Sequence, residues 1–467
     1  MNALRHVLDA VQWGFLGYFI LLNVIYLGLA LIAVYRLRRY MGGVAAAERV
    51  YTHLQMPVSL VVPAYNEEGS IATSVRALLQ LRYQHFEIIV VNDGSKDDTL
   101  GALKREFDLT PFPEAYRVQI KTQPIRGIYR SLKYPNLRVV DKENGGKADA
   151  CNAGLNAARH PIFYCGDADS VLEVHSLEHV VRPFLEDPRT VACGGTVRIV
   201  NGCQVRGGVI EKVGLPKNPL ALVQVVEYLR AFLGGRLGWS AINGLLIVSG
   251  AFGVFHRDTV VAAGGFRADV IGEDMELVVR LHRHLSARGQ RYRVSYIPDP
   301  VCWTEAPEDL KTLAKQRKRW QRGLAESLWE NRTLLFARGS GTAGWLAFPF
   351  FIVFELLSPL IEVGGLVVMA LAWAMGGMTG MGFLAFVAAA FALGLMLSTT
   401  ALLLEELSFH TYPRARHLLV LFGVSLLENL GYRQLNSWWR LQALWGWIRG
   451  ERLQWGAMKR NASWQQN

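Results

Sequence analysis

Between residues 57 and 170 the chain repeats one pattern, in which a short apolar run ends in a polar cluster and a stretch with helical spacing follows. The apolar runs cover residues 58–62, 86–91 and 137–140, and a further run precedes Asp167. Short strands that alternate with helices predict an α/β domain built on a largely parallel sheet. Further strands predicted over 191–200 and 294–297 extend this domain to residues 57–308.

The polar clusters at the ends of these runs are candidate binding loops, because α/β folds bind ligands at the carboxyl ends of their strands. The clusters are Pro63-Ala64-Tyr65-Asn66-Glu67, Asn92-Asp93-Gly94-Ser95 and Asn144-Gly145-Gly146-Lys147. Asp93-Gly94 is also typical of a tight turn, and one segment can serve both purposes. Lys147 can meet a phosphate or a carboxylate, although alone it is equally a solvated lysine. Together the clusters lie where a nucleotide would bind.

Asp167 and Asp169 lie one residue apart, directly after an apolar run. Alternate residues of an extended segment point the same way, so the two carboxylates can converge on one point. Hard oxygen ligands suit Mg²⁺ or Mn²⁺, which in turn suit a phosphate-bearing substrate. By itself the pattern is also that of a solvated turn.

Two further clusters follow in the second half of the chain. Glu273 and Asp274 open a predicted helix over 277–285, where helix N-capping is the alternative to a catalytic role. Gln316, Arg319 and Trp320 belong to a basic amphipathic helix over 311–329, a pattern typical of helices at a membrane surface. Upstream, an apolar helix over 220–237 is interrupted by Glu227, Arg230 and Arg236, and residues 201–218 are predicted to be a mobile loop.

Composition places the chain among membrane proteins, because 51% of its residues are hydrophobic while its net charge is +11. Uncharged or nearly uncharged runs long enough to cross a bilayer cover residues 11–35, 345–375 and 381–404, and two shorter segments lie within 417–447. We expect a kink at Pro359. Arg36, Arg38 and Arg39 place the N-terminus outside and the α/β domain in the cytosol. The basic clusters flank apolar runs, which argues against a nucleic-acid partner.

Polar residues within the apolar segments, such as Glu362, Glu428 and Arg433, are expected to face a cavity. The five cysteines lack Cys-X-X-Cys spacing and are predicted to be reduced thiols that form neither disulfides nor a zinc site.

The ordered set of motifs resembles the processive membrane-bound family-2 glycosyltransferases, which include the hyaluronan, chitin, poly-N-acetylglucosamine and cellulose synthases. The residues that carry the resemblance extend over about 260 positions and are Pro63-Ala64-Tyr65-Asn66-Glu67, Asn92-Asp93-Gly94-Ser95, Gly146-Lys147, Asp167-Ala168-Asp169, Gly272-Glu273-Asp274 and Gln316-X-X-Arg319-Trp320. Each motif alone is weak. Their order is specific, and the last two distinguish polymer-forming members.

The resemblance implies a GT-A fold with a Rossmann-like mixed sheet, a transmembrane helical bundle, and inverting transfer from a UDP-sugar to a growing polysaccharide. We expect the donor to be UDP-N-acetylglucosamine. Asp274 would be the general base and Asp169 would bind Mg²⁺ or Mn²⁺, with Asp167 beside it. The nucleotide and its diphosphate would contact Pro63, Ala64, Tyr65, Glu67, Asp93, Lys147, Asp167, Gln316 and Arg319. The acceptor would contact Trp320 and Glu273. The membrane helices would pass the polymer outward, and envelope secretion partners, where these exist, would receive it.

These expectations divide the chain into a transmembrane helix (1–40), a linker (41–56), the glycosyltransferase domain (57–308), the amphipathic helix region (309–340), C-terminal membrane helices (341–449) and a cytosolic tail (450–467). We expect a multi-pass protein of the inner (plasma) membrane. In the tail, Trp455 and Arg460 are similar to the gating segment of hyaluronan synthases, and a plain basic tail is the alternative. No segment matches the cyclic-dinucleotide domain of cellulose synthases.

Two other functions remain open at this stage. One is a single-transfer enzyme that moves a sugar onto a lipid-phosphate carrier, since such enzymes share the first motifs. The other is a transporter or scaffold that keeps an inactive sugar-binding domain. The intact set of Asp167, Asp169, Asp274 and Arg319 argues against the second.

Overall fold

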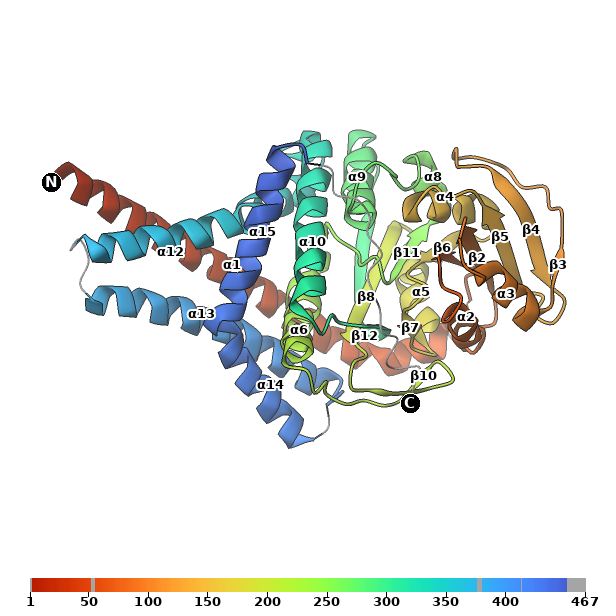
Figure 1. The fold of residues 1–467 in the computed structure, drawn as a ribbon, viewed down its shortest axis with the longest axis horizontal. Coiled ribbons are helices and arrows are strands. Elements are labelled where there is room, and N and C mark those ends of the chain that lie inside the picture. Colours follow the sequence, from red (N-terminus) through yellow and green to blue (C-terminus); the bar gives the residue numbers. More distant parts are fainter. Residues whose placement is uncertain (1, 52–54, 376–379, 413, 452–467) are drawn as a thin grey trace.

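The computed structural model describes residues 2–51, 55–375, 380–412 and 414–451. A mixed sheet with its covering helices forms one part of the molecule, and long helices that extend away from the sheet form the other (Figure 1). We refer to the second part as the helical layer.

Within the described residues the sheet has ten strands, and its centre is parallel, as the sequence predicts. In spatial order the strands are β3 (Leu109–Pro111), β4 (Ile125–Ser131), β5 (Leu137–Lys142), β2 (Phe86–Asp93), β1 (Val58–Ala64), β6 (Ile162–Cys165), β11 (Gly253–His256), β8 (Thr190–Ile199), β12 (Arg293–Thr304) and β7 (Val171–Leu172). Strands β5, β2, β1 and β6 are parallel, and so are β8 and β12. Their carboxyl ends therefore gather the predicted polar clusters at one edge.

The resemblance implies a mixed sheet, but the sequence did not locate its antiparallel strands. Strand β11 lies antiparallel between β6 and β8, and β4 lies antiparallel between β3 and β5. The segment 201–218, predicted to be a loop, contains the hairpin of β9 (Gln204–Arg206) and β10 (Val209–Lys212).

Helices cover both faces of the sheet and so bury its central strands on both sides. The continuous apolar runs of these strands require such burial. The covering helices are α2 (Ile71–Leu79), α3 (Thr99–Phe107), α4 (Lys147–Ala157), α5 (Ser176–Glu186), α8 (Arg257–Ala262) and α9 (Glu273–Ala287). Helix α4 packs directly on β1 and β2. Gly154 permits this contact, because a Cβ there would lie 2.2 Å from Val61 Cγ1.

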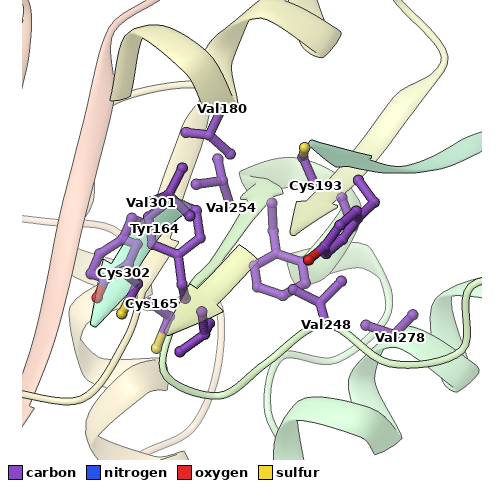
Figure 2. Close-up of a cluster of buried hydrophobic side chains, with 14 of the residues drawn as sticks. Tyr164, Cys165, Val180, Cys193, Val248, Val254, Val278, Val301 and Cys302 are labelled. Atoms are coloured by element: carbon purple, nitrogen blue, oxygen red, sulfur yellow. The ribbon is translucent and has the colours of Figure 1, made fainter. Parts of the chain in front are cut away.

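The core beneath the sheet edge joins strands and helices from distant parts of the chain. Tyr164 and Cys165 of β6 pack there with Val254 of β11 and Val278 of α9 (Figure 2). Cys165 is only two residues before Asp167 in the sequence, so this core lies directly behind the acidic motif. All five cysteines are free thiols, and all five are buried, which the sequence did not predict.

The helical layer begins with α1 (Asn2–Tyr51), one helix of 50 residues. The remaining elements are α6 (Pro219–Leu229), the π-helix η1 (Arg230–Arg236), α7 (Leu237–Ala241), α10 (Leu310–Glu330), η2 (Arg332–Leu334), η3 (Ala343–Ala347), α11 (Phe348–Phe350), η4 (Phe351–Leu356), α12 (Ser358–Ala374), α13 (Gly380–Ser408), α14 (Ala415–Leu427), η5 (Glu428–Tyr432) and α15 (Arg433–Ile448). Helices α10 and α15 lie side by side (Figure 1). The linker predicted over 41–56 is wrong for residues 41–51, which continue α1.

Among the described residues, one helix, over Val11–Gly43, is long and apolar enough to cross a membrane. The pair Ala343–Leu356 and Ser358–Ala374, bent by 44°, passes the same test when the two are taken together. The bend lies at Leu357, just before Pro359, where the sequence predicts a kink. The break predicted within 417–447 is present as well, because Leu430 and Gly431 leave helical geometry between α14 and α15. The transmembrane bundle itself stays a prediction.

Candidate active site

The loops that follow β1 and β2 are tied to each other, which sets two of the predicted clusters side by side. Asn66 adopts φ 57°, a left-handed conformation that asparagine tolerates. Its Oδ1 accepts a hydrogen bond from the Lys96 backbone N–H at 2.8 Å, and its own N–H donates to Ser95 Oγ at 3.0 Å. Tyr65, beside them, is 42% exposed.

Asp93 has a structural task that the sequence did not reveal. Its buried carboxylate accepts hydrogen bonds from the backbone N–H groups of Gly145 at 3.0 Å and Gly146 at 2.8 Å. Lys142 Nζ donates to the same carboxylate at 2.6 Å. Asp93 thus holds the turn that starts α4 and places Lys147. Its contact with a nucleotide stays a prediction, as do those of Pro63, Ala64, Tyr65 and Glu67.

Lys147 joins the two acidic motifs. Its Nζ lies 2.7 Å from Asp167 Oδ1 and 3.1 Å from Glu273 Oε1. Burial alone would lower the pKa of Lys147, but the two carboxylates outweigh burial and raise it well above its usual value. Burial raises the pKa of Glu273, and Lys147 offsets part of that rise. The lysine is therefore a fixed cation between the strand β6 exit and helix α9, and not a solvated side chain.

Asp274 lies in the first turn of α9 and faces Gly250. A Cβ at Gly250 would lie 2.9 Å from Asp274 Oδ2 and 3.4 Å from Lys147 Nζ, so the glycine permits the close approach. The residue in the N-cap position of α9 is Gly272, so neither Glu273 nor Asp274 is the N-cap residue. Asp274 Oδ1 nevertheless accepts a hydrogen bond from the backbone N–H of Met275, within the first turn, at 2.8 Å. Gly272 also contacts Gly323, where a Cβ would lie 3.0 Å from its partner's Cα, and this contact brings α9 against α10.

Asp167 and Asp169 follow β6 as the sequence predicts, and Oδ1 of Asp169 is buried. Among the described residues, no group of three or more histidine, cysteine, aspartate or glutamate side chains converges on one point. A donor set of one or two carboxylates fits Mg²⁺ or Mn²⁺ that takes its other ligands from phosphate oxygens and water. The two aspartates therefore suit a cation that arrives with a diphosphate.

Helix α10 turns its polar side chains into the protein. Gln316 is buried, and Arg317 lies 2.6 Å from Glu227 Oε2 and 4.6 Å from the Trp320 ring centroid. Trp320 itself is 43% exposed. Gln316, Arg319 and Trp320 all line one cavity with Asp274, so the structure brings these predicted residues together.

The cavity has a volume of about 880 Å³ and runs from the acidic motifs into the helical layer. At one end it is lined by Lys147, Asp167, Glu273 and Asp274, and at the other by Glu355, Glu362, Glu428, Arg433, Ser437 and Arg440. The prediction that Glu362, Glu428 and Arg433 face a cavity is confirmed. The loops after β1 and β2 lie outside its lining.

Several arginines of the cavity wall are paired with glutamates. Arg230 lies 2.6 Å from Glu428 Oε1, and Arg433 lies 3.1 Å from Glu362 Oε1. Arg440 donates to Gln321 Oε1 at 2.8 Å and lies 3.7 Å from Glu355. The sequence showed these charges within apolar helices but not their pairing, because each pair joins distant segments. Trp455 and Arg460 lie outside the described residues.

Comparisons with known proteins agree with this geometry. The model of "Glycosyl transferase family 2" matches residues 59–218, and that of "Glycosyl transferase family group 2" matches residues 162–399, more than half of the chain. The poly-beta-1,6-N-acetyl-D-glucosamine synthase of Staphylococcus aureus is 29% identical over 272 residues, which are 58% of this chain and 55% of that protein. The synthase of Staphylococcus epidermidis is 27% identical over the same length. The chain thus matches about half the length of these relatives.

A solved structure shares the fold. The mannosyltransferase of Pyrobaculum calidifontis, in complex with GDP-mannose and Mn²⁺, has a TM-score of 0.51 and 18% sequence identity, and the match covers 90% of this chain and 99% of that one. The sheet part is therefore a GT-A-like mixed α/β domain, as predicted. Taken with the family match over more than half of its length, the chain belongs to glycosyl transferase family group 2.

Proposed function

We propose that this protein is a membrane-bound synthase that polymerises UDP-N-acetylglucosamine and passes the growing polysaccharide into its helical layer. The observation that carries the proposal is the cavity of about 880 Å³, because it connects Asp274 with side chains of α12 and α15. A single transfer requires room for one acceptor sugar. A continuous cavity that leaves the site along helices suits an acceptor that lengthens.

The residues of the site suit inverting transfer. Asp274 takes the proton of an acceptor hydroxyl, whose oxygen forms a bond to the anomeric carbon from the face opposite UDP. The bond between that carbon and the diphosphate breaks, and its electron pair leaves with UDP. Gln316 and Arg319 hold the diphosphate, and Trp320 offers a flat apolar surface to the acceptor sugar. Asp169 and Asp167 would hold a divalent cation, which would supply positive charge to the leaving diphosphate.

The charge pairs of the cavity wall suit a neutral glycan. Each of Arg230, Arg317 and Arg433 lies within 3.1 Å of a glutamate. Paired charges present hydrogen-bonding groups without a strong field of one sign, and hydroxyl and acetamido groups need such partners. This favours N-acetylglucosamine over a uronic acid as the polymerised sugar.

Apolar side chains on the outer faces of the long helices support a location in the bilayer. Large apolar surfaces of this kind mark contacts with lipid or protein. The exposed side chains include Trp13, Ile20, Leu21, Val24, Leu31, Leu360, Leu366, Val367, Leu371, Met381 and Leu384. With the arginines after residue 35 on the cytosolic side, the catalytic domain would lie in the cytosol and the N-terminus outside.

The test is UDP release by the purified full-length protein in lipid nanodiscs, with Mn²⁺ or Mg²⁺ and a panel of UDP-sugars, followed by sizing of the product. We expect release with UDP-N-acetylglucosamine and a long product. Asp274→Asn should reduce turnover about 10²–10⁴-fold. Asp258→Asn, at an exposed carboxylate on α8 outside the cavity lining, is the matched control.

Two outcomes would contradict the proposal. A product one sugar long on a lipid-phosphate carrier would identify a single-transfer enzyme. Binding of UDP-sugars without any release of UDP would identify a domain that binds sugar nucleotides without catalysis.

A further inference from the structure

Arg236 ends the π-helix η1 and lines the cavity near Asp274. Its guanidinium carbon lies 3.9 Å from the centroid of the Phe232 ring. Its Nη1 is buried and has no hydrogen-bond partner among the described residues. A buried donor without a partner is costly, so its retention points to a partner that the substrate supplies.

The other arginines of the wall differ from Arg236. Arg230, at the opposite end of η1, donates to Glu428 and Ser398, and Arg317 donates to Glu227. No carboxylate oxygen of the described residues forms such an ion pair with Arg236. Burial lowers the pKa of this guanidinium, and Tyr296 and Asp274 offset part of the effect. Asp274 therefore lies within electrostatic reach of a cation that has no acidic partner in contact.

The space beside Arg236 is open. A Cβ at Gly234 or at Gly235 would meet nothing within 4 Å, and Gly235 lines the cavity. Trp239 and Ile247 line the cavity nearby, so the wall around the guanidinium offers apolar surface. π-Helices are rare and frequently occur at functional sites.

We infer that Arg236 is an acceptor-binding residue, whose Nη1–H donates to a neutral oxygen of the terminal sugar and so sets a hydroxyl of that sugar against Asp274. The inference rests on the proposed function. Its position favours the acceptor over the diphosphate, because η1 packs on α1, α6 and α13 of the helical layer. Most of the residues expected to hold the nucleotide and diphosphate lie instead at the sheet edge, at the ends of β1, β2 and β6 and at the start of α4. Gln316 and Arg319, on α10, are the two that belong to the helical layer. An apolar surround also suits the face of a pyranose better than a dianion.

The test separates the two ligands. Arg236→Met removes the donor, Arg236→Lys keeps the charge without the planar fork, and Arg189→Met alters an exposed arginine paired with Asp187 as the control. The probes are UDP with Mn²⁺, measured by titration calorimetry, and a β-1,6-linked N-acetylglucosamine trisaccharide, measured as a ligand and as an acceptor.

We expect Arg236→Met to weaken trisaccharide binding and raise its KM about 10- to 100-fold, which is the range for a lost hydrogen bond to a charged group. The Kd for UDP should change less than about 2-fold, which also shows that the variant is folded. The affinity of Arg236→Lys for the trisaccharide should lie between those of Arg236→Met and the unaltered protein. The affinities of Arg189→Met should equal those of the unaltered protein.

The inference is overturned if Arg236→Met weakens UDP and leaves the trisaccharide unaffected, since the ligand is then the diphosphate. It is also overturned if neither affinity changes, or if the unaltered protein does not bind the trisaccharide. A long product together with unaffected Arg236 variants would refute this inference and leave the proposed function standing. Trisaccharide binding that depends on Arg236, in a protein that forms no polymer, would support this inference and refute the proposed function.

Discussion

Removal of the cation between the two acidic motifs should destabilise the protein in a pH-dependent manner. Lys147→Met keeps the length of the side chain but leaves Asp167 and Glu273 without their partner at 2.7 and 3.1 Å. Removal of one member of a buried ion pair costs about 3–5 kcal/mol. The Asp167 side chain is 26% exposed and that of Glu273 is 10% exposed, so we place the cost near the lower limit, at about 3 kcal/mol at pH 8.

The cost should shrink as the pH falls, because Glu273 can bind a proton. Burial raises the pKa of this carboxyl even beside Lys147, and loss of the lysine raises it further. A carboxyl whose native pKa lies above its unfolded value of about 4.3 loses native stability as the pH rises through the native value. At pH 5 a larger fraction of Glu273 is therefore neutral in the variant than at pH 8, and the variant recovers part of its deficit.

The measurement is thermal unfolding in nanodiscs with EDTA and without UDP, at pH 8 and at pH 5. The expected shift at pH 8 is about 6–12 °C, from about 2–4 °C per kcal/mol for a domain of this size. Lys147→Met with Glu273→Gln should unfold at a higher temperature than Lys147→Met alone. Lys212→Met, at an exposed lysine of β10, serves as the control. An equal deficit at both pH values, or strictly additive effects in the double variant, would refute the reasoning.

Three other variants test the packing around the site by thermal unfolding. Burial lowers the pKa of His282 to about 4, against about 6.5 in the unfolded chain, so the free energy of unfolding is constant above pH 6.5 and falls by about 3 kcal/mol towards pH 4. The variant His282→Gln should lack that fall. If its stability depends on pH as that of the unaltered protein does, His282 is not the group responsible. Gly154→Ala should cost about 1–3 kcal/mol by its clash with Val61, and the added Val61→Ala should restore part of the loss. Glu405→Gln should cost about 3–5 kcal/mol, because it strands Arg198, whose side chain is 1% exposed and lies 2.7 Å away. Arg198→Met with Glu405→Leu should recover most of that stability, and a neutral single variant would argue against the pair.

The parallel centre of the sheet and the position of the site could be predicted because both depend on local pattern. Apolar runs such as residues 58–62 indicate strands buried on both faces, and the clusters after them, from Tyr65 to Asp167, lie at strand ends by geometry alone. The same reasoning placed Gln316 and Trp320 on a helix, and their convergence with Asp274 followed from the resemblance.

Other features depend on contacts between distant segments, which no local pattern encodes. The antiparallel strand β4 was missed because its pairing with β5 gives it only a short, half-buried apolar face. Residues 41–56 were interpreted as a linker, although alanines 45–47 are strong helix formers and the helix continues to Tyr51. The link from Lys147 to Glu273 and the unpartnered donor of Arg236 could not be read from single positions.

Helix α1 also sets a mechanical limit. Its 50 residues correspond to about 75 Å of continuous rod. It packs on α12 and α13 in the helical layer, and beyond them Tyr40 donates to Asp299 of β12 while Arg182 of α5 lies 5.2 Å from the Tyr40 ring centroid. Because this single helix is packed against both the sheet part and the helical layer, it fixes the distance between them. If the protein polymerises its product as proposed, side chains and loops along the cavity must move the product forward, because the sheet part and the helical layer cannot swing against each other.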